Sequence, residues 1–122
     1  MVWFAVAMGG ALGSVLRHAV NMFFGHVLGR PGAYATVTVN LIGSLAIGLL
    51  AGFIAGGRLH ETPAMRAFVF VGILGGFTTF SSLMLDTFTL AEGHHLSEAF
   101  LNVAIQIFFG YAAAYVGFRV AA

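Results

Sequence analysis

Four stretches of mostly apolar sequence without a charged side chain divide the chain. They cover residues 1–16, 31–57, 67–85 and 99–118. A helix needs about 20 mostly apolar residues to cross a bilayer, so the pattern predicts four membrane-spanning helices near residues 2–24, 34–57, 65–91 and 98–121. The connections are short and none resembles a linker. We therefore expect an all-α integral membrane protein in which residues 1–122 form a single four-helix unit.

The composition agrees with this pattern. Of 122 residues, 60% are hydrophobic and only 7% are charged, whereas a soluble domain carries about 25% charged residues. So few charges could not cover a surface in water, which excludes a soluble monomer and a disordered chain. Without cysteine, disulfides and thiolate-bound metals are excluded, and five scattered Arg give no electrostatic support for nucleic-acid binding.

The arginines beside the spans are divided almost evenly between the two sides of the membrane. Arg58, Arg66 and Arg119 lie on one side, and Arg17 and Arg30 on the other. Basic residues mark the cytoplasmic side, so this balance leaves two interpretations. The N-terminus is cytoplasmic with a weak signal, or the subunit inserts in both orientations and pairs antiparallel with itself.

Small residues recur every four positions, at Ser44, Gly48, Gly52 and Gly56, and again at Gly9/Gly13 and Gly72/Gly76. In lipid this spacing lets helices approach closely. Four helices packed in this way fill their own interior with side chains. A conduit therefore implies at least a dimer.

The polar residues at membrane depth are the functional candidates. Asn40 can donate to an anion or join two helices. In the run 72–82, two adjacent glycines stand beside four hydroxyl residues, which predicts a break near the middle of the third helix. Freed carbonyls suit a hard cation, whereas hydroxyls, amides and the positive ring edge of Phe80 suit an anion.

Four further polar residues have more than one interpretation. Arg17 lies at a vestibule, reaches the headgroups or caps a freed carbonyl, and Asp86 borders a vestibule or pairs with an arginine. Asn102 and Gln106 are four apart, hence on one helix face, where they line a pathway or join helices. No arrangement of Ser, His and acidic residues singles out a catalytic centre, so no enzyme is expected.

Three motifs resemble those of the Fluc (CrcB-type) fluoride channels. They are Gly9-Gly-x-x-Gly13-x-x-x-Arg17, Thr38-Val-Asn40-x-x-Gly43-Ser44 and Gly75-Gly-Phe-Thr-Thr-Phe-Ser81. The resemblance implies an antiparallel, dual-topology homodimer in the inner or plasma membrane, with two pores through which cytosolic fluoride leaves passively. It also implies a structural sodium ion on the two-fold axis, held by the backbone carbonyls of Gly75 and Thr78.

The resemblance further implies which side chains contact fluoride. Asn40 matches the pore amide, Phe80 the first pore phenylalanine, and Ser81 and Ser82 the hydroxyls beside the pore. Asn102 and Gln106 map to the polar track of the fourth helix and depart from it, since amides stand where hydroxyls are common. Leu83 departs from the pattern because it stands where a second pore phenylalanine is usual, and leucine has no positive ring edge. Either that contact is dispensable here or this pore conducts or selects differently.

Two rival interpretations remain at this stage. A small dual-topology transporter of the multidrug type has a similar size, but proton-coupled exchange of cations needs a membrane-embedded carboxylate. The predicted first helix has none, and Asp86 lies near the end of a span. A membrane scaffold without transport would explain the glycine spacing but would leave the run from Gly75 to Ser81 without a function.

Overall fold

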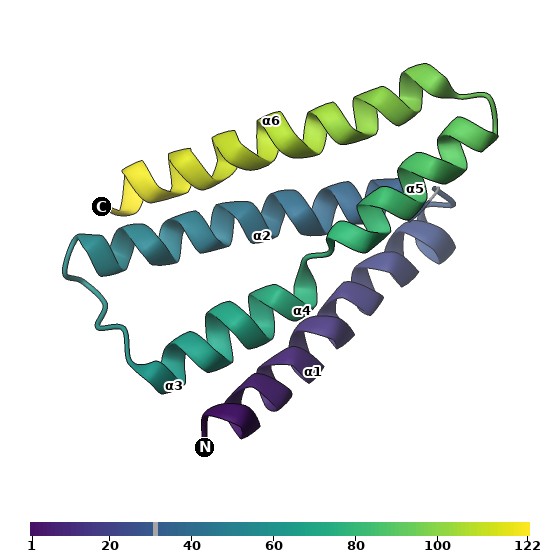
Figure 1. Ribbon diagram of the computed structural model, residues 1–122. Helices are drawn as coiled ribbons and strands as arrows, with labels where there is room; N and C mark the ends of the chain where they lie inside the picture. The colour runs from purple at the N-terminus through teal and green to yellow at the C-terminus, as the bar shows by residue number, and fades with distance from the viewer. Residues whose placement is uncertain (31) are drawn as a thin grey trace.

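The computed structural model describes residues 1–30 and 32–122, and Figure 1 shows helices joined by short connections. Helix α1 (Val2–Met22) continues into a π-helical turn, η1 (Phe23–Val27), and α2 spans Gly32–Ala55. The third rod consists of α3 (Pro63–Met65), the π-helical segment η2 (Arg66–Leu74), α4 (Gly75–Phe77) and α5 (Phe80–Glu92), and α6 spans Leu96–Ala121. The described residues contain no strand, which confirms the all-helical prediction.

Three of these stretches, residues 32–55, 63–92 and 96–121, are long and apolar enough to cross a membrane. Their bounds differ from the predicted ones by a few residues because local turns decide where they end. Gly57 adopts a positive φ of 70° after α2, and the amides of Gly57 and Arg58 donate to Ile54 and Phe53. This is a Schellman motif, which ends a helix at a glycine.

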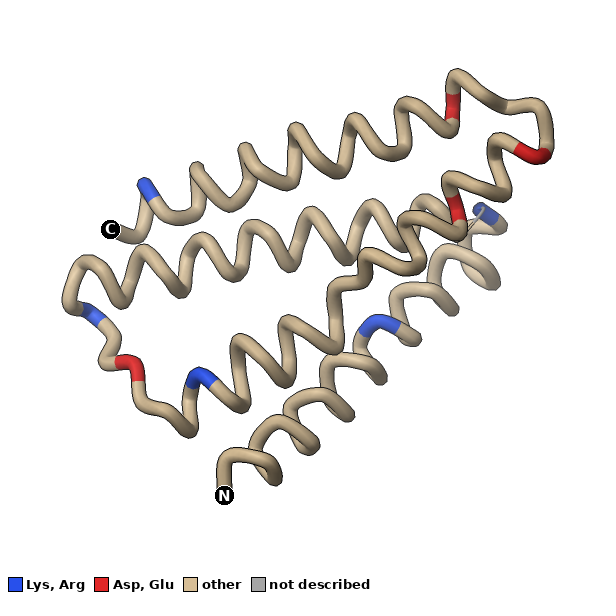
Figure 2. The backbone as a smooth tube through the Cα atoms, viewed as in Figure 1, with Lys and Arg blue, Asp and Glu red and all other residues tan. Residues whose placement is uncertain are grey.

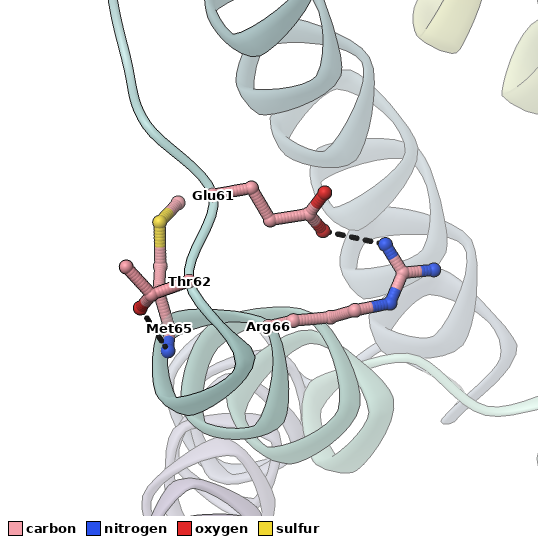
Figure 3. Close-up of polar contacts among 4 residues, drawn as sticks. All are labelled: Glu61, Thr62, Met65 and Arg66. Carbon is pink, nitrogen blue, oxygen red and sulfur yellow. Dashed lines mark hydrogen bonds and ion pairs between the residues drawn. The ribbon is translucent and has the colours of Figure 1, made fainter.

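The third rod begins where Thr62 caps it. The Thr62 hydroxyl accepts a hydrogen bond from the amide of Met65 (Figure 3). Pro63 occupies the first helical position. In the same view the side chains of Glu61 and Arg66 form an ion pair. The cap and the proline explain why this rod starts at residue 63, two residues before the predicted start.

The helices pack as two close pairs, α2 with α6 and α1 with η2 and α4 (Figure 1). Glycines make both contacts possible. A Cβ on Gly48 would lie 2.1 Å from the carbonyl oxygen of Ala114 in α6, and one on Gly9 would lie 2.2 Å from that of Phe68. Between its ends neither α2 nor α6 carries a charge (Figure 2), so the packing relies on van der Waals contact and hydrogen bonds.

The predicted break in the third rod is present, at Thr78 and Thr79. Both residues are extended, with φ/ψ of −83°/158° and −155°/122°. The adjacent glycines precede the break and are themselves helical. Gly76 instead permits close packing, since a Cβ there would lie 2.7 Å from the carbonyl oxygen of Gly10.

Candidate functional site

The break is held open by a side chain from another helix. Asn40 of α2 contacts the backbone of Thr79 twice: its Oδ1 accepts from the Thr79 amide at 2.9 Å, and its Nδ2 donates to the Thr79 carbonyl at 3.0 Å. These two bonds replace the helical hydrogen bonds that Thr79 would otherwise make. Asn40 therefore joins α2 to the break and satisfies the backbone of Thr79, which matches one of its two predicted roles, the joining of two helices.

Thr79 also starts the helix that follows the break. Its Oγ1 accepts from the Ser82 amide at 3.2 Å, as expected of a residue that caps an N-terminus. The hydroxyls of Ser81 and Ser82 both lie 3.2 Å from the same oxygen. Three hydroxyl groups therefore gather at the first turn of α5, two of them at predicted pore positions.

The break releases four successive carbonyl oxygens from the helical hydrogen-bond pattern. The amides that would bond Gly75 and Thr78 in a continuous helix belong to Thr79 and Ser82, and these donate to Asn40 and to Thr79 Oγ1 instead. Within residues 1–30 and 32–122, no hydrogen bond ends on the carbonyls of residues 75–78. The predicted cation ligands, Gly75 and Thr78, are the first and last of this group.

Amide side chains continue the polar contacts from Asn40 into α6. Asn40 Nδ2 donates to Gln106 Oε1 at 2.6 Å, Gln106 Nε2 donates to Asn102 Oδ1 at 3.0 Å, and Asn102 Nδ2 donates to Thr87 Oγ1 at 2.9 Å. Asn102 and Gln106 are 6% and 7% exposed. The structure thus brings three predicted pore residues into one partly buried hydrogen-bond network that joins α2, α6 and α5.

A groove of about 460 Å³ opens on the side of the subunit beside the break. Asn40 and Gln106 line it together with Gly75, Thr78, Phe80 and Leu83. No charged side chain lines this groove. Phe80 is 73% exposed, whereas Leu83 is 5% exposed, so the aromatic ring stands free and the leucine at the second position is packed into the subunit.

Arg17 and Asp86 lie apart from this groove. Arg17 is half-buried and makes no hydrogen bond or ion pair within the described residues. Asp86 has a buried Oδ2 without a hydrogen-bond partner there. An arginine partner for Asp86 is one of its two predicted roles, and within the described residues of one subunit no arginine lies within ion-pair distance of it.

Two residues central to this network were not singled out from the sequence. Thr79 contributes backbone and hydroxyl contacts at the break, and Thr87 receives the Asn102 amide and donates to the Leu83 carbonyl at 2.7 Å. A signal for Thr79 exists, since threonine is a preferred N-cap residue and the apolar residues of α5 follow it. No comparable signal marks Thr87, because its contact with Asn102 is tertiary.

The chain is similar to proteins of known family over almost its whole length. Residues 4–118 match the family model described as CrcB-like protein, Camphor Resistance (CrcB). A protein of Rhodospirillum centenum named fluoride-specific ion channel FluC is 43% identical over 114 residues, which are 93% of this chain and 89% of that protein. Proteins of the same name from Allorhizobium ampelinum and Thermus thermophilus are 44% and 40% identical, covering 94% and 93% of this chain and 91% and 88% of theirs.

Proposed function

The chain belongs to the CrcB-like family, and we propose that it forms a fluoride-selective channel through which cytosolic fluoride leaves passively. It is a multi-pass protein of the cell membrane and not an enzyme. One observation carries the proposal. The groove at the break presents an amide, hydroxyls and an exposed phenylalanine ring to an ion without any charged side chain.

Passage of fluoride requires that these groups replace its water one contact at a time. The proposed donors are the Asn40 amide and the edge of the Phe80 ring, which line the groove, and the hydroxyls of Ser81 and Ser82, which lie beside the groove-lining Thr79. Gln106, which also lines the groove, and its neighbour Asn102 continue the polar contacts along α6. Each contact involves a partial charge. A site of this kind binds weakly enough to release its ion, which conduction requires.

Leu83 supplies no ring edge and is packed into the subunit. At the break, Phe80 therefore provides the exposed aromatic contact, and Phe70 also lines the groove. The absence of an acidic residue from α1 disfavours the multidrug-type alternative. Arg17 and Asp86 lie outside the groove, and we assign them to the pore vestibules.

We also propose that α1 is a fourth span and that two subunits pair antiparallel. At 21 residues, α1 measures about 31 Å at 1.5 Å per residue, close to the ~30 Å thickness of the hydrocarbon core. Because the groove lies on the side of the subunit, a second subunit must cover it to enclose an ion. The even distribution of arginines supports insertion in both orientations.

We propose that the freed carbonyls hold a sodium ion at the two-fold axis of the dimer. Backbone oxygens are hard ligands, and those of Gly75 and Thr78 lack hydrogen-bond donors within the described residues. An axis beside the break would double this pair to four ligands. In this arrangement sodium would neutralise the partial negative charge of the carbonyls and join the two subunits.

Ion efflux from liposomes tests the proposed channel. Purified protein reconstituted in vesicles loaded with potassium fluoride should release fluoride rapidly when valinomycin carries the compensating potassium. Vesicles loaded with potassium chloride should retain their anion, and empty vesicles are the control. Equal release of both anions, or fluoride release only with a proton gradient, would refute a selective passive channel.

A further inference from the structure

The backbone fixes the direction in which the three carboxamides point. Thr79 presents an N–H and a carbonyl to Asn40, so Asn40 must accept with Oδ1 and donate with Nδ2. The second N–H of Asn40 then points at Gln106, which can answer only with its oxygen. Gln106 is therefore oriented with Oε1 toward Asn40.

The Thr87 end of this hydrogen-bond network enforces the same orientation of Gln106. Gln106 Nε2 donates to Asn102 Oδ1, Asn102 Nδ2 donates to Thr87, and the Thr87 hydroxyl donates to the Leu83 carbonyl. A reversed Gln106 would place two NH₂ groups against each other at Asn40 and two carbonyl oxygens against each other at Asn102. Neither pair can form a hydrogen bond.

This orientation leaves Asn40 without a spare donor. One N–H binds the Thr79 carbonyl and the other binds Gln106 Oε1 at the short distance of 2.6 Å. An anion that uses Asn40 must take the second N–H away from Gln106. The displaced oxygen belongs to a side chain that is 7% exposed, where an unpaired acceptor is unfavourable.

We propose that Gln106 sets the affinity of the channel by competing with the permeating anion for the Asn40 amide. The inference rests on the proposed fluoride channel. Fluoride, a small anion and a strong hydrogen-bond acceptor, can displace a carboxamide oxygen, but each binding event costs the Asn40–Gln106 bond. Gln106 thereby keeps binding weak and release fast. The same cost applies to every anion, so Gln106 tunes affinity and leaves preference among anions to other groups.

The test compares fluoride efflux of wild type, Gln106→Met and Gln106→Glu over a range of fluoride concentrations. Methionine has nearly the same shape but no acceptor oxygen, so the half-saturating fluoride concentration should fall about 2- to 10-fold, the equivalent of one neutral hydrogen bond. Glutamate keeps an oxygen facing Asn40, so its half-saturating concentration should equal or exceed that of wild type. An unchanged or higher value for Gln106→Met, or a lower one for Gln106→Glu, overturns the inference.

A second measurement needs no variant. Gln106 is the single glutamine of the chain, so glutamine labelled at its side-chain carbon and nitrogen reports on this residue alone. Fluoride should shift the carbonyl carbon signal with a midpoint at the half-saturating concentration for efflux. A signal that saturating fluoride leaves in place overturns the inference even where efflux is normal. Wild type without fluoride efflux would instead overturn the proposed channel, and the inference with it.

Discussion

Replacing Gly48 with alanine tests how closely α2 and α6 must pack. The new Cβ would lie 2.1 Å from the Ala114 carbonyl oxygen and 2.8 Å from its carbon, whereas carbon and oxygen normally approach to about 3.3 Å. The contacted atoms are backbone, so no rotamer can relieve the overlap. The two helices must separate locally by about 1 Å, which costs about 1–3 kcal/mol by analogy with overpacked cores.

Gly110→Ala is the matched control, because Gly110 belongs to α6, the partner of α2 in the same helix pair, and faces Ser44 of α2. Its Cβ would meet only the Ser44 hydroxyl, at an ordinary 3.5 Å. Both variants gain the same helix propensity, so the difference between them isolates the steric term. Gly48→Ala should show an apparent Tm at least about 4 °C below that of Gly110→Ala in the same detergent. Equal values, or a more stable Gly48→Ala, would refute the proposed close packing.

Two further predictions concern the break. Asn40→Ala removes the hydrogen-bond partners of the Thr79 amide and carbonyl. It should lower the free energy of unfolding by about 1–3 kcal/mol and the rate of fluoride efflux by about tenfold or more. A variant as stable and as active as wild type would contradict the role of Asn40 at the break. Replacing sodium by N-methylglucamine should lower the apparent Tm of the dimer, measured by size-exclusion chromatography after heating, and an unaltered Tm in both salts would argue against sodium ligation by Gly75 and Thr78.

The helices and the presence of a break were predictable because both leave local signals. Apolar runs separated by charges indicate the spans, and glycines beside hydroxyl residues indicate an interruption. The position of the break was not predictable in the same way. It depends on Asn40, a residue 39 positions earlier, whereas Gly76 contributes close packing against Gly10.

In the candidate site, too, some features could be predicted from the sequence and others could not. The spacing of Asn102 and Gln106 places them on one helix face, and the structure confirms that they touch. The orientation of their carboxamide groups, with the Gln106 oxygen toward Asn40, could not be predicted from the sequence. It follows from the Thr79 backbone and the Leu83 carbonyl, which lie at the two ends of the hydrogen-bond network. Sequence spacing gives neighbours along a helix, but the polarity of a network depends on groups from three helices.

The interruption at Thr78 and Thr79 also divides one helix dipole into two. A continuous rod over residues 63–92 would carry partial charges only at its distant ends. The break adds a negative end, at the carbonyls that close the first segment, and a positive end, at the first-turn amides of α5, which lack partners within the helix. Two extended residues thus place opposite poles a few residues apart near the middle of the third rod, where each pole offers a partial charge without any formally charged side chain.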